Sequence, residues 1–159
     1  MNNTTQSQLN SDITSEERLL ALLSHLSIFL GGIILPFIIW ITQKDKSKFI
    51  RFHSLQSIFF QLSMIVILLI FIIIAVIIMV VSGIGFAGSE GESAGFSIGI
   101  IIGMIILYGG IFIIIFGGIV YSVYLSIKSY NGDLIKIPII GNNIYSRVYG
   151  QQDIQLNRS

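Results

Sequence analysis

The sequence contains no cysteine and little charge, and each absence excludes classes of protein. Without thiols the chain can form no disulfide framework, no iron–sulfur site and no cysteine nucleophile. Charged residues make up 11% of its 159 residues, whereas soluble domains carry about 25%. Hydrophobic residues make up 53% and the mean hydropathy is +0.87, more apolar surface than a water-soluble fold of this length could bury. The composition therefore predicts an integral membrane protein.

Three apolar runs contain no Asp, Glu, Lys or Arg, and they cover residues 19–41, 58–81 and 97–127. A helix rises about 1.5 Å per residue and the hydrocarbon layer is about 30 Å thick, so about 20 apolar residues suffice to cross it. We therefore expect an all-α integral membrane bundle with three transmembrane helices and a short interfacial C-terminal segment.

The chain has room for one membrane domain and two tails. Residues 1–18 are predicted to form a disordered polar N-terminal tail, because they offer almost nothing to bury. Residues 19–127 should form the membrane domain, and residues 128–159 a cytoplasmic or interfacial tail. In that tail, residues 131–133 (Asn-Gly-Asp) are expected to end the third helix, and the apolar residues around Pro138 to lie along the membrane surface.

Basic residues gather on one side of the predicted bundle. Four lie between the first and second runs: Lys44, Lys46, Lys48 and Arg51. Four follow the third run: Lys128, Lys136, Arg147 and Arg158. Short segments rich in Lys and Arg stay in the cytoplasm, so the first four are predicted cytoplasmic anchors. The C-terminus should lie in the cytoplasm and the N-terminus outside a bacterial plasma membrane, with Arg18 alone on the outer side.

The first run contains its own helix breakers, so a second topology stays open. Gly31 and Gly32 weaken a helix, and Pro36 removes a backbone donor. A kinked span is the simpler interpretation, because transmembrane helices tolerate Pro and Gly. If the kink became a turn, the run would form a re-entrant hairpin. Both its ends would then face the cytoplasm, and Arg18 would join the other basic residues.

Four polar residues in or beside the runs are candidate functional residues: His25, His53, Gln56 and Gln61. Polar groups are costly against lipid and are expected to face other helices. In the three-span arrangement His25 lies roughly 24 Å from the cytoplasmic end of its helix, so the two histidines could not share an ion. We expect His25 to form a hydrogen bond inside the bundle and His53 to anchor a helix end. The alternative is that His25 marks a path for protons or substrate.

Glycines form a stripe along the third run. The stripe comprises Gly95, Gly99, Gly103, Gly110 and Gly117, which fall within about 80° of one helical face. Gly weakens a helix by about 1 kcal/mol relative to Ala in water, and close approach of another helix would compensate for that loss. The stripe predicts a helix-packing interface within the chain or between copies, although Gly is also simply frequent in membrane helices.

Three segments together carry a family resemblance. They are LALLSHLS at residues 20–27 with Leu35-Pro36, FIRFHSLQSIFFQ at residues 49–61, and Asn131-Gly132-Asp133 with Ile137-Pro138. Over roughly residues 17–140 the chain resembles the small bacterial membrane proteins grouped with the Tic-twenty component of the chloroplast inner-envelope import machinery. The resemblance implies a helical membrane architecture and a role in protein transport.

No reaction is indicated by the polar residues. The spans offer no paired carboxylates, no metal-ligand set and no nucleophile beside a base, so no catalytic, metal or cofactor site is predicted. We expect a non-enzymatic helix-packing scaffold or a component of a protein-translocation or membrane-assembly complex. Its expected partners are the lipid bilayer and membrane proteins or further copies of itself, and not nucleic acid. The alternative is a small channel or transporter subunit that uses the polar residues within the spans.

Overall fold

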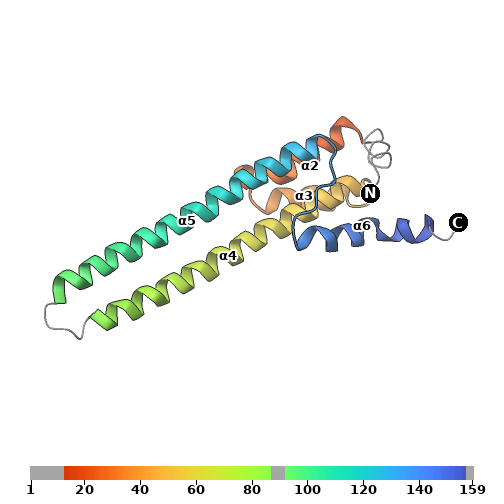
Figure 1. Ribbon diagram of the computed structural model, residues 1–159. Coiled ribbons are helices and arrows are strands. Elements are labelled where there is room, and N and C mark those ends of the chain that lie inside the picture. The colour runs from red at the N-terminus through yellow and green to blue at the C-terminus, as the bar shows by residue number, and fades with distance from the viewer. Residues whose placement is uncertain (1–12, 87–91, 157–159) are drawn as a thin grey trace. The chain divides into compact units, whose positions relative to one another are not determined.

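The computed structural model describes residues 13–86 and 92–156, and the regular structure of this part of the chain is helical (Figure 1). Its five helices are α2 (Ser15–Leu30), α3 (Ile34–Gln43), α4 (Lys48–Phe86), α5 (Glu92–Tyr130) and α6 (Ile140–Leu156). The predicted all-α class is therefore confirmed. Of the polar tail predicted for residues 1–18, residues 1–12 lie outside the described residues, as does the segment around Glu90, and residues 15–18 form the first turn of α2.

The chain divides into two compact units, which are described separately. The first unit consists of Met1–Leu62 and Ile119–Ser159, and the second consists of Ser63–Gly118. The first unit contains α2, α3, α6, the beginning of α4 and the end of α5. The second unit contains the remainder of α4 and α5.

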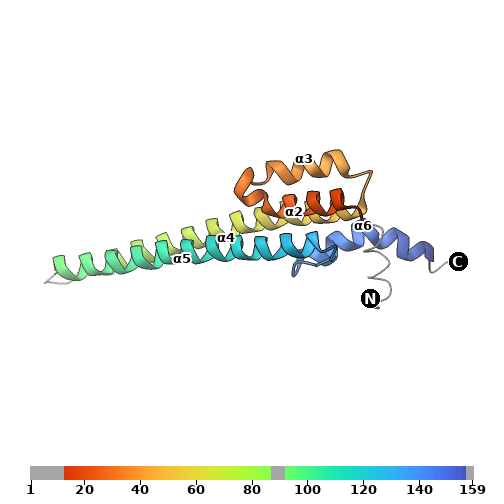
Figure 2. The same cartoon turned by 90° about the horizontal axis from the view of Figure 1, so that it is seen from above.

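The first apolar run folds as two helices with a reversal between them (Figure 2). α2 begins with a capping box, in which the Thr14 hydroxyl accepts a hydrogen bond from the Glu17 amide and the Glu17 carboxylate accepts one from the Thr14 amide. The helix ends where the amides of Gly31 and Gly32 both donate to the Ser27 carbonyl, at 3.0 and 2.7 Å. Gly32 has a φ of 55°, a left-handed conformation that glycine adopts at no steric cost.

After this reversal, α3 returns beside α2 (Figure 2). Pro36 lies in the first turn of α3, where backbone amides have no partner within the helix, so the missing donor costs little. α3 has 10 residues, or about 15 Å of helix, and is too short to cross a bilayer. The continuous span predicted for residues 19–41 is therefore wrong, because two adjacent glycines let the chain turn back. The hairpin alternative is the arrangement observed.

Two helices are long enough to span a membrane. α4 and α5 have 39 residues each. Within them, Lys48–Val81 and Gly99–Tyr130 are the candidate membrane spans of the described residues. They contain nearly all of the second and third predicted runs. α4 begins ten residues before the apolar run at residue 58, because its first turns are amphipathic and pack within the first unit.

In the second unit, small residues on α5 face large side chains on α4. A Cβ atom added to Gly110 would overlap the ring of Phe71, and one added to Gly118 would overlap the end of Met64. A Cβ atom on Gly103 would lie 3.3 Å from Cγ of Met79. The pairing runs antiparallel, as expected for a helical hairpin. These glycines therefore let the two helices approach more closely than a larger side chain would permit.

In the first unit, α6 packs on the beginning of α4. A buried apolar cluster joins Phe52 of α4 to Ile144, Val148 and Tyr149 of α6. α5 ends at Tyr130 and is followed by Gly132 with a φ of 87°, so the turn predicted at residues 131–133 is confirmed. The C-terminal segment forms a 17-residue helix rather than only a short apolar stretch.

Candidate functional site

A buried cluster of polar side chains lies inside the first unit, where α2, α4 and α5 meet. Its members are at most 6% exposed: Ser24, His25, Ser27, His53, Ser54, Ser57, Gln61 and Ser122. Ser24 and Ser27 on α2 are three residues apart, and Ser54, Ser57 and Gln61 on α4 are three and four apart, which places each set on one helical face. Each histidine is adjacent in sequence to the first serine of the set on its helix. α2 runs parallel to the beginning of α4, since Ser24 contacts Ser54 and Ser27 contacts Gln61.

The two histidines form the centre of this cluster. Nε2 of His25 lies 3.3 Å from Nδ1 of His53, and the two rings meet edge to face with centroids 5.5 Å apart. Phe49 and Phe52 pack their rings against His53, at centroid distances of 4.5 and 5.1 Å. The expectation that the histidines lie far apart is wrong, because it assumed a continuous first span. The hairpin brings them into contact.

The outer nitrogen atoms of this pair are buried. Within the described residues, neither Nδ1 of His25 nor Nε2 of His53 has a hydrogen-bond partner. One ring must donate to the other for the contact to be a hydrogen bond, which requires a neutral imidazole on the accepting side. Burial of both rings, away from water, favours the neutral form of the pair.

Serine hydroxyls tie α2 to its neighbours through backbone carbonyls. Ser27 donates to the Ser24 carbonyl at 2.7 Å, and Ser57 of α4 donates to the same carbonyl. Ser122 of α5 donates to the His25 carbonyl. The Ser24 carbonyl therefore accepts from two hydroxyls, which share its remaining acceptor capacity, and the His25 carbonyl accepts from one. Small hydroxyl residues thus allow close helix contact and supply the polar partners.

Gln61 closes the end of the cluster nearest the reversal. Its amide nitrogen donates to the hydroxyl of Ser27 at 2.6 Å and to that of Ser57 at 3.2 Å. A Cβ atom on Gly32 would lie 3.7 Å from the Gln61 side-chain oxygen, so the turn between α2 and α3 packs against this side chain. The predicted candidates His25, His53 and Gln61 are therefore brought together.

Gln56 acts elsewhere, on the connection that precedes α6. Its amide nitrogen donates to the Ile135 carbonyl at 2.8 Å, and its oxygen accepts from the Ile137 amide at 2.8 Å. One side chain therefore satisfies a donor and an acceptor of a segment that has no helical hydrogen bonds. The fully buried Gln56 fixes this connection against α4.

The remaining predicted residues lie outside the cluster. Lys44, Lys46 and Lys48 are exposed around the beginning of α4, and Arg51 is half-buried. Of the glycine stripe, Gly103 and Gly110 face α4 as described above, whereas Gly117 has open space around it and its neighbour Gly118 makes the contact. Gly95 and Gly99 lie in α5. Their role in packing stays a prediction.

The serines are the residues that the sequence reasoning missed. Ser24 and Ser27 are three residues apart, as are Ser54 and Ser57, and Ser122, Ser126 and Ser129 continue the spacing on α5. Pairs of serine at helical spacing within apolar sequence are a signal for close helix packing. That signal indicates that each of these faces packs closely against another helix, but it does not say which helix.

The cluster is suited to holding helices together and to orienting a proton between two imidazoles. Among residues 13–86 and 92–156, no group of three or more His, Cys, Asp or Glu side chains is placed to hold a metal ion. The two histidines alone supply half of the four ligands that a tetrahedral site needs.

Together, the fold and this cluster define a helical membrane protein in which a short helical hairpin is held against the beginning of α4 and the end of α5. A family model matches residues 16–144, which is most of the chain and includes the whole cluster. The chain belongs to the MamF/MmsF family, described as the magnetosome magnetite crystal formation protein family. No curated protein and no solved structure matches it.

The resemblance to the Tic-twenty-like proteins is therefore a wrong assignment. The residues that suggested it are those that place polar groups in an apolar helix: His25, Pro36, His53, Gln56 and Gln61. In the structure His25, Pro36, His53 and Gln61 belong to the hairpin or to its contacts with α4, and Gln56 holds the connection before α6, so these residues report an architecture and not a role in protein import.

Proposed function

We propose that this protein is a non-enzymatic component of the magnetosome membrane that supports magnetite crystal formation as a helix-packing scaffold. The observation that carries the proposal is the family match over residues 16–144. This range contains the hairpin, both candidate spans and the beginning of α6. The membrane location and the role in crystal formation both follow from the family description.

In this proposal the α2–α3 hairpin enters the bilayer without crossing it. The residues around its reversal are large, apolar and exposed: Phe29, Leu30 and Ile34 are 57%, 67% and 69% exposed. Apolar side chains of this size are stable in lipid and costly in water. On the side of the hairpin that faces α4, the buried polar cluster supplies hydrogen-bond partners to side chains and carbonyls that lipid could not satisfy.

A hairpin and two spans give a membrane domain with one basic face. All nine Lys and Arg residues then lie on the same side as both termini, including Arg18, which was isolated in the three-span interpretation. We propose that this side is the cytoplasm, in agreement with the distribution of basic residues in membrane proteins. This proposal therefore assigns the N-terminus to the cytoplasm, in place of the outer side expected from three spans. The domain organisation proposed is a re-entrant hairpin, two spans and an interfacial α6.

The scaffold role rests on the exposed face of α5. Tyr108, Phe112 and Phe116 are spaced four residues apart and are 67%, 66% and 56% exposed. Phe112 and Phe116 stack with centroids 5.6 Å apart. An ordered aromatic ridge of this kind offers contact area for a second membrane helix. We propose self-association or contact with other membrane proteins through it.

The test is complementation in a magnetite-forming bacterium whose own family member has been deleted. Expression of this chain should restore crystal size and number in electron micrographs. The variant Ser24→Leu, which separates α2 from α4, should fail to restore them, whereas Ser24→Ala should succeed. Absence of any effect on crystals, with the protein present in the magnetosome membrane, would contradict the proposal.

A second candidate function, a small channel or transporter subunit, is favoured by the unpaired outer nitrogens of the buried histidine pair. Ionisable groups inside a membrane domain are often parts of proton or ion paths. Proteoliposomes with a pH-sensitive dye in the lumen test this candidate. Proton flux that depends on His25 and His53 would support it, and flux that is absent or is unchanged in His25→Ala would exclude it.

A further inference from the structure

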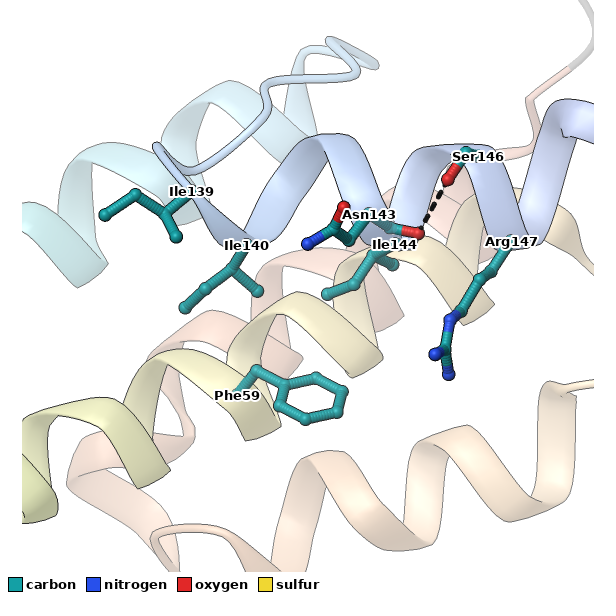
Figure 3. Close-up of a pocket in the computed structure, with 7 residues that line it drawn as sticks. All are labelled: Phe59, Ile139, Ile140, Asn143, Ile144, Ser146 and Arg147. Atoms are coloured by element: carbon teal, nitrogen blue, oxygen red, sulfur yellow. Dashed lines mark hydrogen bonds between the residues drawn. The ribbon is translucent and has the colours of Figure 1, made fainter.

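A groove of about 510 Å³ separates α6 from the beginning of α4 within the first unit (Figure 3). It is lined by Phe59, Ile139, Ile140, Asn143, Ile144, Ser146 and Arg147. Figure 3 shows Ile140, Ile144 and Arg147 extending from α6 toward the side of Phe59 on α4. The groove therefore has an apolar stretch of four side chains with a guanidinium at one end.

The turn that forms one end of the groove is held in a fixed shape. Gln56 binds the backbone on both sides of Lys136, as described above. A Cβ atom on Gly141 would lie 2.6 Å from Cα of Lys136, so only glycine fits where α6 begins. The amide of Gly141 donates to the Ile137 carbonyl at 2.7 Å. The groove is thus built in advance of any ligand.

This rigid turn presents one isoleucine in a costly conformation. Ile139 has a φ of 71° and is 89% exposed. A left-handed conformation is rare for a β-branched residue, and such strain tends to persist at binding sites, where the surrounding structure enforces it. Here the turn directs a large apolar side chain away from the protein, at the mouth of an apolar groove.

Arg147 is the cation of the groove that is available for a ligand. Lys128 is engaged by Asp133 at 3.2 Å, and Nζ of Lys136 lies 3.7 Å from the centre of the Tyr145 ring. Within the part of the chain that the structure describes, Arg147 forms no salt bridge and its side chain is exposed. A planar guanidinium binds phosphate oxygens in pairs, and the amide of Asn143 can add a further donor.

The position along α4 indicates where this groove meets the bilayer. The last charged residue of α4 is Arg51, and residues 52–81 carry no charge, which is more than enough to cross the hydrocarbon layer. Phe59 lies about two helical turns beyond Arg51, which places it at the boundary between the headgroups and the hydrocarbon. A ligand with a phosphate and an adjoining hydrocarbon chain is the chemistry found at that level.

We propose that this groove is a binding site for one anionic phospholipid. Its phosphate group lies against Arg147 and Asn143, and one acyl chain lies along Phe59, Ile140 and Ile144 toward Ile139. The proposal concerns lipid recognition at the first unit and is independent of the role in crystal formation.

The experiment uses the full chain in lipid vesicles, with one tryptophan in the groove. Phe59→Trp in a Trp40→Phe background provides that reporter, since the chain has a single tryptophan. Quenching by brominated phosphatidylglycerol is compared with quenching by brominated phosphatidylcholine. We expect about tenfold stronger association of phosphatidylglycerol, because the choline ammonium of phosphatidylcholine offsets the phosphate charge that faces Arg147, whereas phosphatidylglycerol keeps it. Arg147→Gln should abolish this preference.

Two further variants separate binding from folding. Lys46→Gln removes an exposed charge elsewhere in the first unit and should keep the preference. Ile139→Asn relieves the backbone strain, because Asn tolerates the left-handed region. This variant should be at least as stable to unfolding as the unmodified protein. It should nevertheless bind lipid more weakly, because it lacks the apolar side chain. The proposal would be overturned if the two lipids associated equally, or if Lys46→Gln reduced the lipid preference as much as Arg147→Gln. It would also be overturned if millimolar glycerol phosphate displaced the lipid.

Discussion

Nε2 of His25 lies 3.3 Å from Nδ1 of His53, and this contact joins helices whose histidines are 28 residues apart in the chain. Both side chains are 1% exposed. The contact exists because the chain turns back after α2, at Gly31 and Gly32. α2 therefore lies beside the first turns of α4. It makes the hairpin and the beginning of α4 one packed structure.

The histidine pair should show strong coupling in a double-mutant cycle. His25→Ala leaves a cavity and an unpaired nitrogen on His53, so it should lower the free energy of unfolding by about 2–4 kcal/mol. His53→Ala should have a similar effect. The double variant should lose less than the sum by about 0.5–3 kcal/mol, measured by thermal unfolding in detergent. Strictly additive losses would show that the two rings do not depend on one another.

The topology can be read by labelling single cysteines, since the chain has none of its own. Thr14→Cys, Lys46→Cys and Asn143→Cys are all exposed positions of the first unit. Inverted vesicles expose the cytoplasmic face of the membrane to the medium. A membrane-impermeant maleimide added to that medium should label all three cysteines. Labelling of Thr14→Cys from the opposite side would instead support a complete first span.

Adjacent glycines of α5 provide a matched pair for helix packing. Gly110→Ala places a methyl group in the ring of Phe71 and should lower the free energy of unfolding by about 1–3 kcal/mol. Gly109→Ala meets nothing within 4 Å and should be neutral or stabilising. Phe71→Ala should remove the difference between the two. Equal effects of both alanines would mean that the α4–α5 contact is not the one described.

Gln56 should control the local stability of the connection before α6. Gln56→Ala removes two hydrogen bonds of 2.8 Å and leaves the Ile137 amide without its acceptor. We expect a loss of about 1–3 kcal/mol and faster hydrogen exchange at Ile137. Gln43→Ala, on a half-buried residue of α3, is the control. Unchanged exchange at Ile137 would contradict the role assigned to Gln56.

Glu17 should make the hairpin sensitive to acid. Burial acts to raise the pKa of Glu17, but hydrogen bonds from Ser47 and from the amide and hydroxyl of Thr14 outweigh it and hold the pKa below its ordinary value. A lowered pKa stabilises the fold at pH values above the ordinary glutamate range. This contribution is lost as the pH falls through the lowered pKa. Glu17→Gln should remove that part of the pH dependence, measured by thermal unfolding between about pH 3 and 7.

The sequence predicts those elements whose signals are local. Thr14 and Glu17 form a capping box, Gly132 ends α5, and the apolar runs at residues 58–81 and 97–127 fall almost wholly within the candidate spans. Each depends on a few neighbouring residues or on length alone.

The reversal at Gly31 and Gly32 could not be decided from the sequence. A kinked span and a hairpin contain the same residues and differ only in whether α2 finds partners on α4. Those partners are Ser54, Ser57 and Gln61, which lie about 30 residues further along. The histidine contact depended on that decision, so it could not be predicted either.

The distribution of these partners along the chain sets an order of assembly. Ser24, His25 and Ser27 precede in the chain the groups that bind them, which come from α4 and, with Ser122, from the far end of α5. The polar face of the hairpin can therefore be satisfied in full only after the end of α5 has been synthesised, so the hairpin reaches its final packing late in assembly.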